Sequence, residues 1–245
     1  MFHFGNANES QREAITAANG PVLITAGPGT GKTYTLVQRV IYLIQECGVK
    51  PENIFIATFT EKAAKELITR ITNELSNRGI GVNINEMYVG TFHSLCLRIL
   101  KDHLEFTRLR RNYRLLDAFD QQYMVFQNIY RFRNLPEITA VLPNDGAWKQ
   151  SQAICNYVNN LSEELVAPEE LMLDPDPSIA ALGRILKEYH EILTEGNLMD
   201  FSSIQIEAYR LLQHHPDILE ELRSNITHIM VDEYQDTNYI QEQMI

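Results

Sequence analysis

A glycine-rich run near the N-terminus constrains the fold of this chain more than any other feature. Its eight residues are Ala26-Gly27-Pro28-Gly29-Thr30-Gly31-Lys32-Thr33. An apolar run, Val22 to Thr25, precedes it and a stretch with helical periodicity follows it. This is the strand–loop–helix order of a phosphate-binding loop, in which glycines let successive backbone N–H groups point inward at the helix N-terminus. The sequence therefore predicts a phosphate-binding site at this loop.

Two side chains at the end of the loop specify the ligand further. Lys32 is expected to reach the β- and γ-phosphates of a nucleotide, and the Thr33 hydroxyl is expected to bind Mg²⁺. Ala26 stands at the first position of the strict glycine pattern, but this departure costs little because the turn is built from the three glycines that follow. A plain turn would explain the glycines without explaining a Lys-Thr pair at the start of a helix.

Composition places the chain among globular proteins. Its 245 residues, 44% of them hydrophobic, suffice for one large domain or two modest ones. No run approaches the roughly 18 apolar residues of a membrane helix and no apolar signal segment opens the chain, so we expect no membrane partner and a cytoplasmic location. Cys47, Cys96 and Cys155 lack metal-type spacing and are predicted to be buried or half-buried thiols in a reducing compartment.

Charge is distributed unevenly along the chain. The net charge is −11, yet residues 58–114 carry ten Lys or Arg and six Asp or Glu, a local charge of +4. Residues 161–245 carry four basic and eighteen acidic residues, a local charge of −14. This pattern is compatible with a polyanion bound on one face and equally with solvated acidic helices, so charge neither proves nor excludes DNA binding.

Strand and helix patterns alternate through the first hundred residues. Asn8 to Gln11 fits a helix start in which Gln11 completes a capping box, with the helix running to about Ala18 and stopping at Asn19-Gly20-Pro21. The expected elements that follow are a helix from the glycine loop to near Gly48, a strand at Ile54–Thr58, a helix capped by Thr60 and ending near Leu75, a strand at Met87–Phe92, and a helix from His93 to about Leu104. Such alternation predicts an α/β fold with a parallel sheet.

The alternation breaks in the middle of the chain. Residues 108–198 offer mainly helical patterns, at Phe119–Phe132, Trp148–Glu164 and Ile179–Thr194, and are interpreted as a helical insertion. Alternation resumes with a run from Ile226 to Val231 that is apolar apart from Thr227 and His228. We therefore expect a nucleotide-binding domain made of residues 1–107 and 199–245, interrupted by a subdomain made of residues 108–198.

Two adjacent carboxylates form a second chemical centre. Ile229-Met230-Val231 delivers Asp232 and Glu233 to the C-terminal end of a buried strand, where ligands bind in open α/β sheets. Strand residues alternate sides, so Asp232 is predicted to hold Mg²⁺ and Glu233 to orient and deprotonate an attacking water. By itself the pair is also consistent with a helix-capping loop. Together with the phosphate loop it indicates nucleotide hydrolysis.

Five segments in order give the chain a family resemblance. They are Gln11, Ala26 to Thr33, Thr58-Phe59-Thr60-Glu61-Lys62-Ala63-Ala64, Gly90-Thr91-Phe92-His93-Ser94, and Asp232-Glu233-Tyr234-Gln235-Asp236-Thr237. This order resembles the UvrD/Rep/PcrA-type DNA helicases of superfamily one, and Met199-Asp200-Phe201 is similar to their segment that joins the insertion back to the core. The resemblance implies a P-loop NTPase (RecA-like) domain with helices on both faces of its sheet, and ATP with Mg²⁺ as cofactors.

The resemblance assigns further residues to the nucleotide. Gln11 would read the adenine edge, a role compatible with its place in the capping box. Gln235 would sense the γ-phosphate and link hydrolysis to domain movement, whereas taken alone it could be a plain turn residue. Tyr34 stands near the nucleotide where relatives often have Arg, so nucleotide recognition is expected to differ there.

The resemblance also implies a path for single-stranded DNA. Thr58 and Thr60 would contact phosphates, and Phe59 would stack on a base, although by itself Phe59 would be interpreted as a core residue. Three further residues, Lys62, Thr91 and His93, would lie along the same path, while His93 alone would more often be structural. Glu61 stands where relatives commonly have Asn, and it either caps the helix or weakens a phosphate contact.

The implied activity is ATP-driven movement on single-stranded DNA, with 3′-to-5′ polarity and a role in repair or replication. The alternatives are the helicase subunit of a helicase–nuclease and a regulatory ATPase that does not unwind DNA. The family's second RecA-like domain, with its transition-state arginine and adenine-stacking tyrosine, has no counterpart before Ile245. We therefore expect an N-terminal half that is nearly inactive alone. Pathway, oligomeric state, and repair or nuclease partners stay open.

Overall fold

The computed structural model describes residues 2–17 and 20–245, which pack as two compact units. The first unit comprises Met1–Leu95 and Glu220–Gln235, and the second comprises Cys96–Leu219 and Asp236–Ile245. Packing thus divides the chain at other positions than the predicted boundaries, 107/108 and 198/199. The difference arises because most of α4 (Phe92–Asp102) and all of α10 (Phe201–His214) fall in the second unit. The predicted functional domains remain a prediction.

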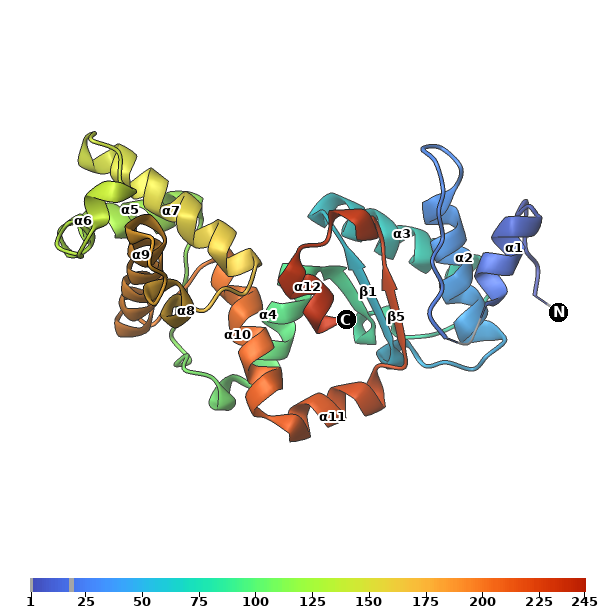
Figure 1. The fold of residues 1–245 in the computed structure, drawn as a ribbon. Coiled ribbons are helices and arrows are strands. Elements are labelled where there is room, and N and C mark those ends of the chain that lie inside the picture. The colour runs from blue at the N-terminus through green and yellow to red at the C-terminus, as the bar shows by residue number, and fades with distance from the viewer. Residues whose placement is uncertain (1, 18–19) are drawn as a thin grey trace. The chain divides into compact units, whose positions relative to one another are not determined.

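The first unit is built on a three-stranded parallel sheet (Figure 1). The strands are β1 (Ile54–Thr58), β2 (Tyr88–Thr91) and β5 (His228–Val231), in the order β2-β1-β5. Ala57 is in register with Gly90 on one side and Val231 on the other, so the carboxyl ends of all three strands meet at one edge. The predicted α/β class with a parallel sheet is confirmed.

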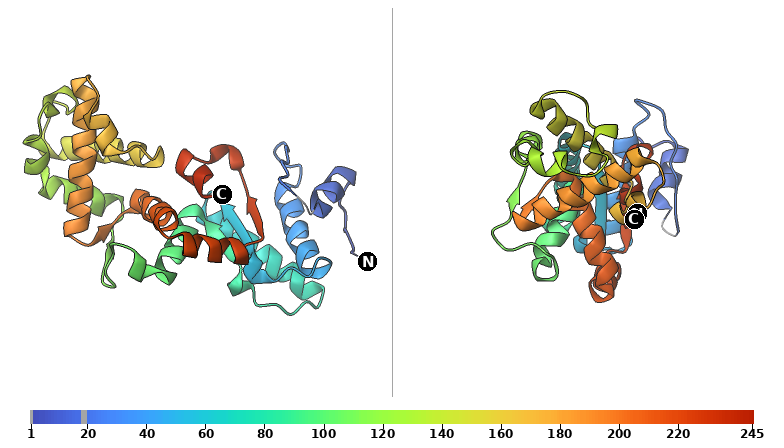
Figure 2. Two further views of the ribbon diagram at one scale, coloured as in Figure 1. Left: turned by 60° about the horizontal axis from the view of Figure 1, so that its bottom comes forward. Right: turned by 60° about the vertical axis from the view of Figure 1, so that its left-hand side comes forward.

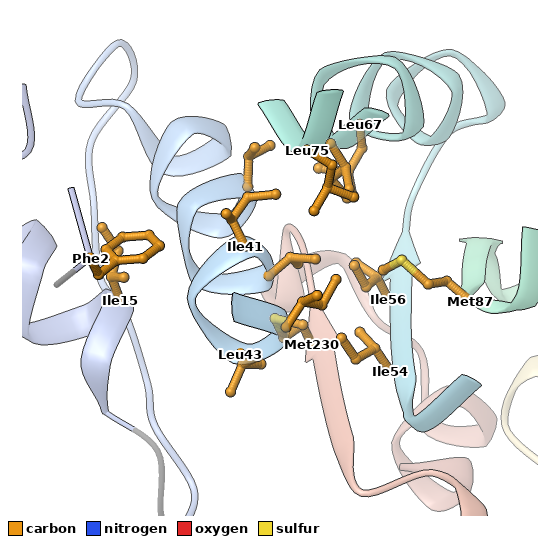
Figure 3. Close-up of a cluster of buried hydrophobic side chains, with 14 of the residues drawn as sticks. Phe2, Ile15, Ile41, Leu43, Ile54, Ile56, Leu67, Leu75, Met87 and Met230 are labelled. Carbon is orange, nitrogen blue, oxygen red and sulfur yellow. The ribbon is translucent and has the colours of Figure 1, made fainter. Parts of the chain in front are cut away.

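Side-chain alternation along β1 gives each face of the sheet its own core. Ile54 and Ile56 point into a cluster with Met230, with Ile41 of α2 (Lys32–Gln45) and with Leu67 of α3 (Glu61–Asn77) (Figure 3). The opposite face places Ala57 against two side chains at the start of α4, Phe92 and Leu95. Helical residues therefore cover both faces, as period-two alternation in a buried strand requires.

The predicted strand before the glycine loop is absent from the sheet. Residues 21–27 form neither helix nor strand, and the Leu23 side chain is 82% exposed, with Val22 and Ile24 also exposed. Both edges of β1 are already paired, which leaves only the outer edges of β2 and β5. Pro21 and Pro28 border the run, and neither can donate a backbone hydrogen bond to a ladder. The run is apolar, as a strand would be, but it does not pair with a strand of the sheet.

The other elements of the first unit follow the predicted pattern closely. Helix α1 (Glu9–Thr16) begins with the predicted capping box between Asn8 and Gln11, and its predicted end at Ala18-Asn19 lies outside the described residues. Thr60 caps α3 by accepting from the Ala63 amide. The remaining elements are the short 3₁₀ helices η1 (Pro51–Asn53), η2 (Ile84–Glu86) and η5 (Tyr234–Asp236), and α11 (Pro216–Asn225), which spans the unit boundary.

The second unit is mainly helical, as predicted for the insertion (Figure 2). Its elements besides α4 and α10 are η3 (Leu104–Phe106), β3 (Arg114–Leu115), α5 (Ala118–Gln127), α6 (Ile129–Arg133), η4 (Ile138–Ala140), α7 (Ala147–Glu163), α8 (Pro168–Met172), α9 (Pro177–Glu195), β4 (Leu198–Met199) and α12 (Tyr239–Met244). The helix predicted at Phe119–Phe132 is broken at Asn128, whose side chain donates to the Met124 carbonyl and so competes with the helical ladder. Strands β3 and β4 form a two-residue parallel pair.

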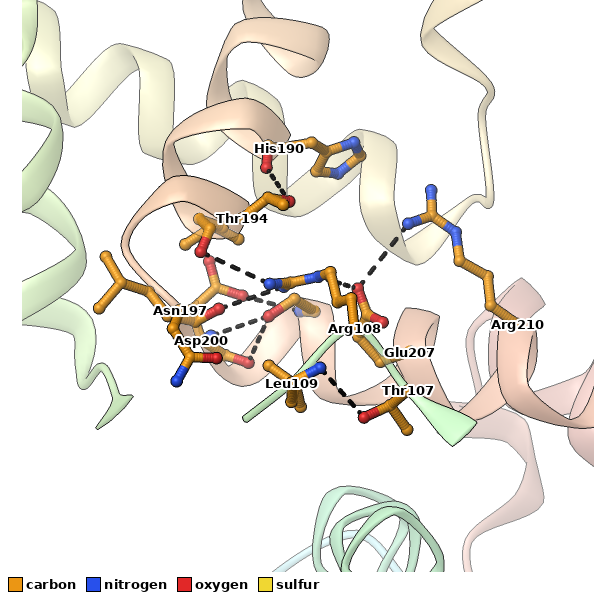
Figure 4. Close-up of polar contacts among 12 residues, drawn as sticks. Thr107, Arg108, Leu109, His190, Thr194, Asn197, Asp200, Glu207 and Arg210 are labelled. Atoms are coloured by element: carbon orange, nitrogen blue, oxygen red, sulfur yellow. Dashed lines mark hydrogen bonds and ion pairs between the residues drawn. The ribbon is translucent and has the colours of Figure 1, made fainter. Parts of the chain in front are cut away.

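Two polar clusters hold the ends of this helical unit together. The Arg108 guanidinium donates to the Glu207 carboxylate at 2.7 Å and to the Leu198 carbonyl at 3.1 Å (Figure 4). Asp200 is buried, caps α10, and accepts from the Tyr189 hydroxyl and from the Gln121 amide. A buried carboxylate with several donors is stable where an unpaired one would be costly.

Helix α9 contacts α8 closely because of one glycine. A Cβ built on Gly183 would come within 2.7 Å of the Pro168 carbonyl oxygen, so only glycine fits there. The cysteine prediction holds for Cys96 and Cys155, which are buried, and is wrong for Cys47, which is exposed near the end of α2. None of the helices in the described part of the chain has the length and apolar character needed to cross a bilayer.

Candidate functional site

The glycine loop leads directly into α2 and leaves the first turn of that helix open. Gly29 and Gly31 have φ angles of 74° and 88°, a left-handed conformation that glycine adopts without strain. Gly31 is the N-cap residue and supplies no side chain to the helix. The Thr30 hydroxyl donates back to the Gly27 carbonyl at 2.7 Å and closes the loop on itself. An uncapped helix N-terminus behind a closed glycine turn is a favourable environment for an anion.

Lys32 connects this loop with the predicted carboxylate centre. Its ammonium lies 2.9 Å from one carboxylate oxygen of Glu233 and 3.0 Å from the other, although 201 positions separate the two residues in the chain. Their side chains are 34% and 37% exposed, so a ligand can reach both. The structure thus brings together the two motifs that the sequence could only pair by chemistry.

Glu233 occupies an unusual backbone position. Its φ angle of 55° places a non-glycine residue in the left-handed region two positions after the end of β5, a conformation that is uncommon and concentrates at functional sites. The Gln235 amide donates to its carboxylate at 2.6 Å, so Gln235 contacts the predicted base. The hydrogen bond from Gln235, followed by that from Lys32, lowers the pKa of Glu233. Glu233 is therefore ionised at neutral pH.

Asp232 differs from its neighbour in environment. Its backbone amide donates to the Ala57 carbonyl at 2.9 Å, which fixes it at the carboxyl edge of the sheet. Burial and then the charge of Glu233 raise the pKa of Asp232. The two adjacent carboxylates thus have pKa shifts of opposite sign.

The predicted magnesium ligands are one carboxylate and one hydroxyl. Within residues 2–17 and 20–245, no group of three or more His, Cys, Asp or Glu side chains is arranged to hold a metal. Mg²⁺ beside a nucleotide does not need such a group, because it keeps several waters and binds one or two carboxylates together with phosphate oxygens. The partly buried Asp232 carboxylate and the Thr33 hydroxyl in the first turn of α2 suit that mode of binding.

Gln11 makes the predicted capping contact and a second contact that the sequence did not indicate. Its carboxamide oxygen accepts from the Asn8 amide at 3.0 Å, and its nitrogen donates to the Thr30 carbonyl at 3.0 Å. The capping box is confirmed, and the same side chain holds the glycine loop. Tyr34, the other predicted nucleotide residue outside the loop, donates its hydroxyl to the Phe4 carbonyl at 2.8 Å.

The predicted DNA residues differ in how much of them a ligand can reach. The Phe59 side chain is 62% exposed, so Phe59 is not the core residue that it resembles when taken alone. Thr58 is buried and its hydroxyl donates to the Thr60 carbonyl, whereas the Thr60 hydroxyl caps α3. Lys62 is exposed one residue into that helix. Phe59, Thr60 and Lys62 are thus accessible, whereas Thr58 is not.

The second predicted DNA segment lies at the end of β2. The Thr91 hydroxyl donates to the Glu61 carboxylate at 3.0 Å and accepts from the Ser94 amide at 3.2 Å. Glu61 therefore links the two DNA segments, a contact that neither alternative considered for it includes. His93 is half-buried, and burial lowers its pKa, so its imidazole is neutral near pH 7.

Sequence reasoning missed one accessible group of residues altogether. Phe119, Tyr123, Phe126 and Trp148 are exposed and contact one another on α5 and α7. The spacing of 119, 123 and 126 was visible as a helical stripe, but periodicity alone does not tell whether a stripe faces a core or solvent.

Comparison with known proteins places the chain in a family. Residues 7–245 match the UvrD/REP helicase N-terminal domain. The chain is 32% identical over 241 residues to the ATP-dependent DNA helicase PcrA of Staphylococcus epidermidis, covering 98% of this chain and 31% of that protein. It is 33% identical over 234 residues to DNA helicase II of Escherichia coli, covering 96% of this chain and 30% of that protein.

A eukaryotic relative shows the same similarity. The ATP-dependent DNA helicase SRS2 of Saccharomyces cerevisiae is 35% identical over 230 residues, which cover 89% of this chain and 19% of that protein. The chain therefore belongs to the UvrD/REP helicase N-terminal domain family, as the motif order predicted. It spans less than a third of the length of the PcrA and helicase II relatives.

Proposed function

We propose that this chain is the nucleotide-binding part of an ATP-dependent DNA helicase that moves along single-stranded DNA. The observation that carries the proposal is the contact between Lys32 and Glu233, which joins a phosphate loop to a catalytic carboxylate within one compact unit. Family membership and relatives named as ATP-dependent DNA helicases support the same conclusion.

Each group has a defined task in this proposal. The loop amides and Lys32 bind the phosphates of ATP, Thr33 and Asp232 hold Mg²⁺, and Gln11 contacts the adenine. Magnesium, when bound, neutralises phosphate charge during hydrolysis. Glu233 accepts a proton from the attacking water, and Gln235 holds the Glu233 carboxylate in position. Phe59 stacks on a DNA base, and Lys62 contacts the backbone.

The coupling of hydrolysis to movement requires a second domain that contacts the nucleotide from the other side. We propose that a second RecA-like domain of the same polypeptide supplies it, and that the 245-residue chain alone hydrolyses ATP only slowly. An arginine contributed by such a domain is typically worth about 10³–10⁵ in rate. A 3′-to-5′ direction, a role in repair or replication, and a cytoplasmic location belong to the proposal and rest on the family resemblance.

The test is stimulation of ATP hydrolysis by single-stranded DNA in the full-length protein. Wild-type protein should show it, and Lys32→Ala should lose it together with ATP binding. Glu233→Gln should lose hydrolysis while still binding ATP, and normal turnover in that variant would remove Glu233 from the role of base. A regulatory ATPase that does not unwind DNA would hydrolyse ATP without responding to DNA.

A further inference from the structure

The exposed aromatic residues of the second unit form one continuous surface. We call Phe119, Tyr123 and Phe126 of α5 together with Trp148 of α7 the aromatic cluster. The Phe119 and Tyr123 rings are stacked with centroids 6.2 Å apart and an interplanar angle of 4°. Trp148 closes the group, with ring centroids 6.1 Å from Phe119 and 5.5 Å from Phe126. Four mutually contacting aromatic rings exposed on two adjacent helices indicate an interaction site.

These rings face solvent although the same helices have a well-filled core. Met124 and Val125 of α5 and Ile154 of α7 are buried in the cluster that also contains Phe132. Phe119, by contrast, is 65% exposed. The helices thus have an aliphatic inner face and an aromatic outer face, so packing within the unit does not account for the aromatic cluster.

The character of this outer face favours nucleobases over another protein as its occupant. Every large apolar side chain exposed on α5 and α7 is aromatic, and the aliphatic ones that usually anchor a helix in a protein groove are buried or partly buried. Aromatic faces stack on any base, which is how single-stranded nucleic acid is bound without sequence preference. One side-chain amide lies beside the rings, since Gln122 donates to the Trp148 carbonyl.

Two arginines contact the helices that carry the aromatic cluster. Arg114 pairs with Asp120, the neighbour of Phe119, at 3.0 Å, and Arg133 donates to Gln150, two residues after Trp148, at 2.9 Å. Residues 110–133 carry five arginines and two aspartates, a local charge of +3 in a chain whose net charge is −11. The three aromatic residues of α5 therefore lie in a locally basic stretch of this acidic chain, within which Arg131 pairs with glutamates of α9.

We propose that the aromatic cluster is a second stacking site for single-stranded DNA, formed by a set of residues separate from Phe59. Bases stack on the Phe119, Tyr123, Phe126 and Trp148 rings while Arg114 and Arg133 contact the backbone. The inference rests on the proposed function, because it takes single-stranded DNA as the substrate of the whole protein. Its consequence is that the helical unit holds the strand independently of the nucleotide-binding unit.

The chain provides its own probe, because Trp148 is its single tryptophan. An oligothymidylate of about 16 nucleotides, the upper end of the site size of one binding module, should quench Trp148 emission saturably. Phe119→Ala should raise the half-saturating concentration about 5- to 140-fold, the range that corresponds to one lost stacking contact. Phe119→Leu should do the same, because it keeps the apolar side chain and removes only the π-face.

Two control variants define the specificity of that loss. Tyr123→Phe keeps the aromatic face and should leave the half-saturating concentration unchanged. Phe106→Ala removes an exposed aromatic ring of the same unit outside the aromatic cluster and should also leave it unchanged. All four variants alter exposed or half-exposed side chains, and their far-ultraviolet circular dichroism should match that of the wild type.

A labelled oligothymidylate, followed by anisotropy, separates this inference from the proposed function. Binding that depends on Phe59 and leaves Trp148 emission unchanged would overturn the second site and leave the proposed function standing. No binding by either readout would overturn both. Emission that changes with protein concentration in the absence of DNA, with dimers in sedimentation, would show that the aromatic cluster contacts a second copy and would overturn the inference. Retained affinity in Phe119→Leu would do so as well.

Discussion

Replacing Glu233 with Gln should strengthen the binding of ATP, because the Glu233 carboxylate competes with the phosphates for the Lys32 ammonium. The Lys32 ammonium contacts both carboxylate oxygens, at 2.9 and 3.0 Å, and cannot serve the γ-phosphate without leaving them. The amide of Gln has no charge and holds the ammonium only weakly. The variant therefore removes a competitor that is built into the site.

The magnitude follows from the exposure of the pair. Both side chains are about one-third exposed, so solvent screens their attraction and the pair contributes at most about 1 kcal/mol. Since about 1.4 kcal/mol corresponds to a tenfold change, the dissociation constant for ATP should fall about two- to fivefold. The gain should shrink at high salt, because ions screen an exposed pair.

Isothermal titration calorimetry with Mg²⁺ and ATP, at low and at high ionic strength, measures this change. Glu46→Gln is the matched control, since it removes the same charge from an exposed position of the same unit that has no contact with Lys32. An equal gain in affinity for ATP in the control would show that the change in net charge, and not the release of Lys32, causes the effect. A tenfold or greater loss of affinity in Glu233→Gln would refute the reasoning, because Glu233 would then be holding the nucleotide.

Three further predictions address DNA contact, stability and pH. Lys62→Ala should lower the salt slope of oligothymidylate binding by about 0.7, while the exposed Lys50→Ala leaves it unchanged; equal slopes would place the strand elsewhere. Asp200→Ala should lower the free energy of unfolding in urea by about 2–4 kcal/mol, because it removes a helix cap and leaves buried donors unpaired. The control Asp117→Ala removes an exposed helix cap and should cost about 0.5–2 kcal/mol. Equal losses in the two variants would refute the stabilising role of the buried network. Burial lowers the pKa of His190 to about 4. As the pH falls, the unfolded chain takes up a proton there before the folded chain does, so the free energy of unfolding should fall by up to about 3 kcal/mol between about pH 7 and pH 4. His190→Gln should lack this part of the pH dependence.

Local features of the fold could be predicted because they depend on neighbouring residues. The bounds of β1, Ile54 to Thr58, agree with the sequence because a short apolar run between polar residues is typical of a buried strand. The Thr60 cap and the capping box of Gln11 agree for the same reason, since capping involves residues three positions apart.

Features that depend on distant partners could not be predicted in the same way. Val22 to Ile24 has the composition of a strand, but pairing depends on which sheet edges are open, and composition does not record that. The contact between Lys32 and Glu233 spans 201 positions. The sequence predicted only that both residues act in nucleotide hydrolysis, without predicting that they contact each other. The family resemblance supplied the order of the motifs and the roles of their residues, whereas the contacts among those residues came from the structure.

The contact between Lys32 and Glu233 also affects how strongly Glu233 can act as a base before ATP is bound. Without nucleotide, hydrogen bonds from Gln235 and Lys32 lower the pKa of Glu233, which makes its carboxylate a weaker base. Phosphates that draw Lys32 away remove one of those two contacts, and losing that contact by itself raises the proton affinity of Glu233. Gln235 stays bound to the carboxylate and keeps it oriented. Under the proposed function, Lys32 thus links the phosphates of the nucleotide to the base that activates water.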